Sequence, residues 1–185
     1  MKTVLNFAQK LMNKLITRPK LEDKLNFKGK FVFEHWRNGK KIGEWDMFNG
    51  ITNEGKNLIL DVMFSDATQI AAASWYIGLI DNSGFTALAA GDVMNSHSGW
   101  NELTTEYDET TRPAWGPGNP SGQSITNASP VVFTFNTSAA VYGAFITSNN
   151  TKGGTTGKLW STGAFNAVRN VVNGDEIRTN YTLSC

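Results

Sequence analysis

The chain has 185 residues, 40% of them hydrophobic and 18% charged, which suits one globular domain with a short appended arm. Its one cysteine, Cys185, excludes an internal disulfide framework, and its two histidines, His35 and His97, leave little for a zinc or iron site. The net charge of +1 is uneven, because residues 1–50 carry eleven Lys or Arg against five Asp or Glu, and residues 51–185 carry six against eleven.

Residues 1–27 are predicted to form an arm and linker outside the main domain. In VLNFAQKLMNKLI, the apolar residues recur at the spacing of an amphipathic helix, which ends before Pro19. One face holds Val4, Ala8, Leu11 and Leu15, with Leu5, Met12 and Ile16 beside it. Polar residues interrupt the pattern, so we expect neither a signal peptide nor a membrane span. The basic arm is either a surface that meets an anionic partner or a solvated charged helix.

Residues 30–48 contain the clearest local signal. The run KFVFEHWRNGKKIGEWDMF has two strand-like segments around Asn38-Gly39, a pair that accepts the positive φ angles of a type I′ turn. A β-hairpin is therefore predicted, with Trp36 and Trp45 on its two arms and able to pair across it.

The next run, NGITNEGKNLILDVMF, changes to a helical period. Thr52 or Asn53 can cap the helix, and Glu54 suits its first turn. The predicted apolar face consists of Leu58, Ile59, Val62 and Met63.

The remainder of the chain predicts a β domain over residues 28–185. Short β-rich runs, SWYIGLIDN, PVVFTFNT, VYGAFITSN, GKLWSTGAF and EIRTNYTLS, are separated by turn residues. Together with the hairpin and one short internal helix, they favour a β-sandwich of jelly-roll type. Between the first two runs lies a long irregular insertion, residues 82–128, and insertions of this length are usually functional or disordered.

The chain offers few candidate catalytic residues. His97 has serine neighbours but no nucleophile-elbow pattern, and His35 is most simply a packed hairpin residue. The acidic run ELTTEYDE could hold a cation or serve glycoside hydrolysis, although a solvated acidic loop is the simpler interpretation. TKGGTTGK lacks the phosphate-loop arrangement and predicts a hairpin loop. We expect no enzyme, no catalytic residues, no cofactor and no metal.

The six tryptophans divide into three groups. Trp36 and Trp45 belong to the hairpin, whereas Trp75 and Trp160 lie in predicted strands and are expected in the core. Trp100 and Trp115 lie in the insertion, where they could plug the end of the sandwich, anchor a protein interface or stack on a sugar.

Three long runs together resemble a family of small tailed-bacteriophage structural proteins. They are NGITNEGKNLILDVMF, SWYIGLIDNSGFTALAAGDVMNSHSGWNE and TTRPAWGPGNPSGQSITNASPVVFTF, and the similarity extends from about Lys30 to the C-terminus. The family is similar to capsid cement (decoration) proteins with a jelly-roll fold, which clamp neighbouring capsid subunits from outside. The resemblance implies no catalytic residues, and it does not cover the arm.

The resulting hypothesis is a non-enzymatic cement protein of the capsid exterior, made in the host cytoplasm. Its expected partners are the major capsid protein and a second copy of itself, most simply as a dimer, with neither nucleic acid nor a membrane involved. The candidate interface residues are Leu5, Leu11, Lys14, Leu15, Arg18, Trp100, Arg112 and Trp115.

This hypothesis predicts that deleting residues 1–27 weakens binding to the particle. The alternatives are a tail, fibre or portal-associated protein, a carbohydrate-binding module that uses Trp100 and Trp115, and a membrane-surface protein that uses the basic helix.

Overall fold

The computed structural model describes residues 26–185. The predicted arm helix lies outside the described residues, and so do the candidate interface residues Leu5, Leu11, Lys14, Leu15 and Arg18. Phe27 already packs against the domain, because its ring meets the ring of Trp160 edge-on with the centroids 6.4 Å apart. The first strand begins at the next residue, Lys28.

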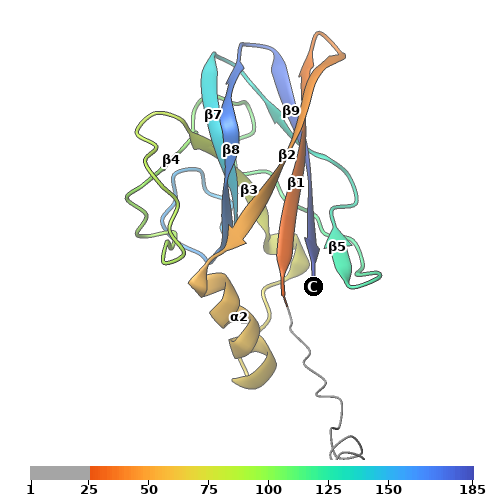
Figure 1. The fold of residues 1–185 in the computed structure, drawn as a ribbon, viewed down its shortest axis with the longest axis vertical. Helices are drawn as coiled ribbons and strands as arrows, with labels where there is room; N and C mark the ends of the chain where they lie inside the picture. Colours follow the sequence, from red (N-terminus) through yellow and green to blue (C-terminus); the bar gives the residue numbers. More distant parts are fainter. Residues whose placement is uncertain (1–25) are drawn as a thin grey trace, which may run out of the picture.

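The described part of the chain is mainly β, as predicted, with one α-helix and a single 3₁₀ turn (Figure 1). The strands are antiparallel and follow the order β4-β3-β7-β8-β2-β1-β9-β5, with β6 also paired to β9. In chain order the elements are β1 (Lys28–Arg37), β2 (Lys40–Ile51), α2 (Asn53–Phe64), η1 (Ala72–Ser74), β3 (Tyr76–Asp81), β4 (Asn101–Glu102), β5 (Ser124–Thr126), β6 (Val131–Thr134), β7 (Ala139–Thr147), β8 (Leu159–Val171) and β9 (Asp175–Ser184).

The predicted hairpin is confirmed as β1 and β2. Asn38 and Gly39 have φ angles of 50° and 70°, as a type I′ turn requires. The predicted pairing of Trp36 with Trp45 is wrong, because the two-residue turn fixes Trp36 opposite Lys41. A one-residue bulge after His35 then places Trp45 opposite Phe33, and the two rings stack with centroids 5.6 Å apart.

The sheet folds so that its two parts face each other across the main core, which is rich in aromatic side chains. β2 makes the turn possible, since it pairs with β1 over most of its length and with β8 through its last residues, Gly50 and Ile51. Figure 1 shows β2 running obliquely from β1 towards β8. Both parts of the sheet contribute to the core, with Phe31, Phe33, Ile177 and Tyr181 from β1 and β9, and Ile77, Val141, Ile146 and Phe165 from β3, β7 and β8. Such packing is consistent with a β-sandwich.

The start of helix α2 is fixed firmly to β8. The Thr52 hydroxyl caps the helix by accepting a hydrogen bond from the Gly55 amide at 3.0 Å, and it donates to the Leu159 carbonyl at 2.5 Å. Glu54 accepts a further bond from the Leu159 amide at 2.8 Å. Gly55 is the buried residue of α2, and a Cβ there would lie 2.5 Å from the Trp160 carbonyl oxygen. Close contact between helix and strand therefore requires glycine at this position.

The insertion at residues 82–128 is largely irregular, but it is a packed part of the domain. Trp100, Leu103, Tyr107 and Trp115 are all buried. Trp100 belongs to a second, smaller cluster together with Ile80, Met94, Phe145 and Leu159. Through Trp100 the insertion thus covers the face of β3, β7 and β8 that points away from the main core, and it does not extend freely into solvent.

Candidate interaction surface

Trp100 is a buried structural residue. Its indole Nε1 donates to Asp92 Oδ2 at 3.0 Å, and the ring of His97 stacks on it with the centroids 3.8 Å apart. Asp92 also accepts a hydrogen bond from the Ala89 amide at 2.9 Å. Trp100 therefore organises the loop around it.

Arg112 is 1% exposed and forms a buried ion pair. Its Nε and Nη2 donate to the two carboxylate oxygens of Glu102, both at 2.7 Å, in a bidentate arrangement. The same guanidinium donates to the carbonyls of Asn149 and Gly154 at 2.9 and 3.1 Å. Arg112 thus joins the insertion to the loop between β7 and β8.

Trp115 closes the end of the core. Its Nε1 donates to the Tyr181 carbonyl at 3.1 Å, and its backbone amide donates to the Trp75 carbonyl at 2.8 Å. Trp100, Arg112 and Trp115 are 2%, 1% and 7% exposed, and each completes hydrogen bonds within its own domain. Their role as contacts with a partner stays a prediction.

A second polar cluster holds the far end of the hairpin. The buried Asp175 carboxylate accepts bonds from Arg37 Nε at 2.6 Å and Arg37 Nη2 at 2.7 Å, and from the Val172 amide at 2.9 Å. His35 Nε2 lies 2.8 Å from the same carboxylate. The Arg37 guanidinium, with help from the Val172 amide and His35, holds the pKa of Asp175 well below its usual range. The cluster ties β1 to the turn between β8 and β9.

Three carboxylates of the acidic run 102–109 form hydrogen bonds that stabilise the fold. Glu106 accepts from the amides of Thr104 and Thr105, and Glu109 accepts from the Thr134 amide. With Glu102 paired to Arg112, the interpretation as a solvated loop is wrong for these three carboxylates. Across residues 26–185, no three His, Cys, Asp or Glu side chains lie close enough together to hold a metal ion.

The most exposed apolar surface of the described domain lies on helix α2. Phe64 is 80% exposed, Met63 65% and Leu60 56%. Leu60 and Phe64 are four residues apart, so they share one side of the helix, which we call the outer face of α2. Figure 1 shows α2 projecting from one end of the sheet, on the opposite side from the Asn38-Gly39 turn. Large exposed apolar side chains grouped in this way mark surfaces that bind other molecules.

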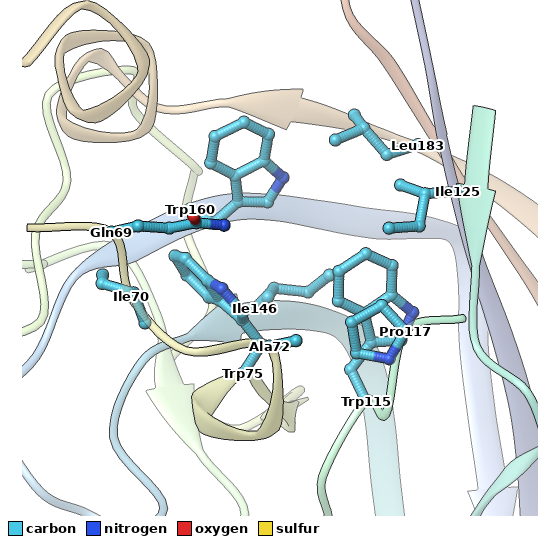
Figure 2. A pocket seen from close by; sticks show the side chains of 10 residues that line it. All are labelled: Gln69, Ile70, Ala72, Trp75, Trp115, Pro117, Ile125, Ile146, Trp160 and Leu183. Carbon is cyan, nitrogen blue, oxygen red and sulfur yellow. The ribbon is translucent and has the colours of Figure 1, made fainter. Parts of the chain in front are cut away.

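An apolar groove runs from the inner side of α2 to the end of the sheet. Its first hollow lies against α2 and is lined by Leu58, Ile59, Val62, Met63, Gln69, Ile70, Trp75 and Trp160. Its second hollow shares Gln69, Ile70, Trp75 and Trp160 with the first and continues past Ala72, Trp115, Pro117, Ile125, Ile146 and Leu183 (Figure 2). Each hollow has a volume of about 220 Å³, which is small for a ligand site.

The groove offers few polar groups to a ligand. The indole Nε1 atoms of Trp115 and Trp160 both point inward, because the first donates to the Tyr181 carbonyl and the second to the Tyr181 hydroxyl at 3.1 Å. Figure 2 shows Gln69 at one edge of an otherwise apolar lining. Such a surface fits apolar side chains better than a sugar, which would need several hydrogen-bond partners.

The sequence pattern predicts an apolar helix face of Leu58, Ile59, Val62 and Met63, and it predicts Trp75 in the core within a strand. In the structure, Trp75 precedes β3 and is half-buried, and Ile59 alone of those four is packed against the main core cluster. One signal was available: residues 58–64 read LILDVMF, and a helix that is apolar almost all round cannot bury every side against one domain.

Comparisons with known proteins do not assign the chain to a family: no family model matches it, and no curated protein matches it. No helix in residues 26–185 combines the length and apolar character needed to cross a membrane.

Proposed function

We propose that this protein is a structural component of a tailed-phage particle that binds the outer surface of the capsid and stabilises it by clamping neighbouring major capsid subunits. Under this proposal the domain is a sandwich of the jelly-roll type, and the protein self-associates, most simply as a dimer. Two observations support it. Residues from about Lys30 onward resemble small tailed-phage structural proteins, a group similar to capsid decoration proteins, and the domain presents an exposed apolar end.

The outer face of α2 is the observation that carries the proposal. Phe64 and Leu60 have the size and exposure of anchor residues that fill pockets on a partner. Full burial of such a side chain contributes about 1.5–3 kcal/mol. A contact of this modest strength suits a cement protein, because attachment of an oligomer through several sites raises its overall affinity.

The test compares binding of two variants to purified capsids that lack the protein. Leu60→Ser combined with Phe64→Ser should weaken binding by roughly 30-fold or more, since about 2 kcal/mol or more of apolar burial is lost. Lys40→Ser, an exposed change beside the hairpin turn at the opposite end of the domain, should bind like the unaltered protein. Circular dichroism checks that both variants fold. Equal occupancy of the double variant and the unaltered protein would remove the outer face of α2 from the proposal.

Copy number in purified particles separates the capsid role from its nearest rival. A cement protein is present in proportion to the major capsid protein, whereas a tail, fibre or portal-associated protein follows the symmetry of a single vertex or of the tail. A carbohydrate-binding role has less support, because Trp100 and Trp115 are buried and their indole nitrogens are already bonded.

A further inference from the structure

We infer that the groove between α2 and the end of the sheet is the docking site for the protein's own residues 4–16, which bind it as an amphipathic helix. The inference concerns the inner side of α2 and not its outer face. It holds or fails independently of the capsid role, because its test uses the isolated protein.

The described chain begins close to the groove. Phe27 lies against Trp160, and Trp160 lines both hollows of the groove. The described chain therefore begins beside a residue that lines both hollows. Nine residues, 17–25, separate Ile16 from Asn26, and in extended form they span about 30 Å. Helix α2, with 12 residues, is about 18 Å long, so residues 4–16 can reach any part of the groove.

The apolar spacing of residues 4–16 suits the apolar groove. The groove consists of two adjoining apolar hollows, and helices that bind apolar grooves place side chains into them at positions i, i+4 and i+7. Val4, Ala8 and Leu11 follow this spacing and Leu15 continues it. A helix of about this length is marginal alone in water and needs a surface on which to bury its apolar face.

Residues 1–25 and the described domain carry net charges of opposite sign. Residues 1–25 carry six Lys or Arg and two Asp or Glu, whereas residues 26–185 carry eleven against fourteen. Asp61, in the last turn of α2, and Asp66, two residues after its end, are exposed carboxylates with which basic side chains of a docked segment could pair. Lys10 and Lys14 lie off the apolar face of residues 4–16 and would point towards solvent and these carboxylates.

The short linker favours binding of the chain's own segment over binding of a segment from a second copy. A linker as short as residues 17–25 holds the segment near the groove at an effective concentration in the millimolar range. A second copy reaches that concentration only when the protein itself is present at comparable levels.

The test is hydrogen–deuterium exchange of the full chain, read for the peptides that cover residues 4–16. These amides should exchange at least about tenfold more slowly than in Leu11→Asp, which places a charge on the apolar face. Asn13→Asp adds the same charge on the polar side and should leave the protection in place. Ile70→Asp, at the wall of the groove, should abolish the protection just as Leu11→Asp does.

Two results would overturn the inference. The first is equal exchange of residues 4–16 in the unaltered protein and in Leu11→Asp. This comparison does not use Ile70→Asp, so it stays valid even if that variant fails to fold. The second is protection that disappears on dilution, because the segment would then be binding a second copy. Loss of protection at residues 59–75 after removal of residues 1–25 would support the inference from the side of the groove.

Discussion

Replacing Arg112 with methionine should destabilise the domain strongly, because the change leaves the Glu102 carboxylate buried without its cation. The side chains of Arg112 and Glu102 are 0% and 6% exposed, and two bonds of 2.7 Å join them. Methionine fills a similar volume, so the lost packing is small and the unpaired charge dominates the outcome. The carbonyls of Asn149 and Gly154 lose a donor as well.

The expected loss can be placed within the known range. Breaking a buried ion pair by removing one partner costs about 3–5 kcal/mol. Glu102 keeps one donor, the Gly153 amide at 2.8 Å, which favours the lower part of that range, about 3 kcal/mol. For a domain of this size, that corresponds to a decrease in Tm of roughly 6–12 °C.

The assay is urea unfolding of a double-mutant cycle with Glu102→Gln. The variant that carries both changes should be more stable than Arg112→Met alone, because it buries no unpaired charge. Arg178→Met is the matched control: Arg178 pairs with Glu176 at a site where both side chains are about a third exposed, so its loss should cost about 1 kcal/mol or less. If Arg112→Met cost no more than Arg178→Met, the buried pair would not be what holds the insertion in place.

Two further predictions concern the ends of the domain. Asp175→Asn should lower stability at neutral pH and flatten its dependence on acid: the pKa of Asp175 is depressed when folded, so its contribution is complete above the ordinary value of 3.8 and is lost as the pH falls below it. Unfolding measured from pH 6 down to pH 2 tests this, and an unchanged slope would contradict it. Gly55→Ala should lower the Tm because a Cβ would meet the Trp160 carbonyl at 2.5 Å, whereas Lys56→Ala at the exposed neighbouring position should not; equal Tm values would show that α2 can shift without cost.

Features governed by near neighbours in the chain were predictable from the sequence. Asn38-Gly39 gave the hairpin because its positive φ angles are a local property, and Thr52 gave the start of α2 because a cap bonds to an amide three residues on. The later strands followed from alternating patterns such as that of Phe133 and Phe135 on either side of Thr134, and both phenylalanines are buried in the core.

Features that depend on distant contacts could not be predicted. Arg112 looked like a surface cation in a loop, and its burial arises from carbonyls in residues 149–154, which only the fold brings to it. The exposed face of α2 has the same origin. The helix is fixed at its start to β8, more than a hundred residues away, and this attachment directs its later turns away from the core.

The pairing of β1 with β9 places two sites that can be modified at opposite ends of the domain. These strands run side by side from Lys28 opposite Ser184 to Arg37 opposite Asp175, so the Asn38-Gly39 turn and Cys185 lie at opposite ends. A peptide grafted into the exposed turn would be displayed far from the apolar end of the molecule. A dye on the exposed thiol of Cys185 would instead sit two residues from Leu183 in the groove and report on what binds there.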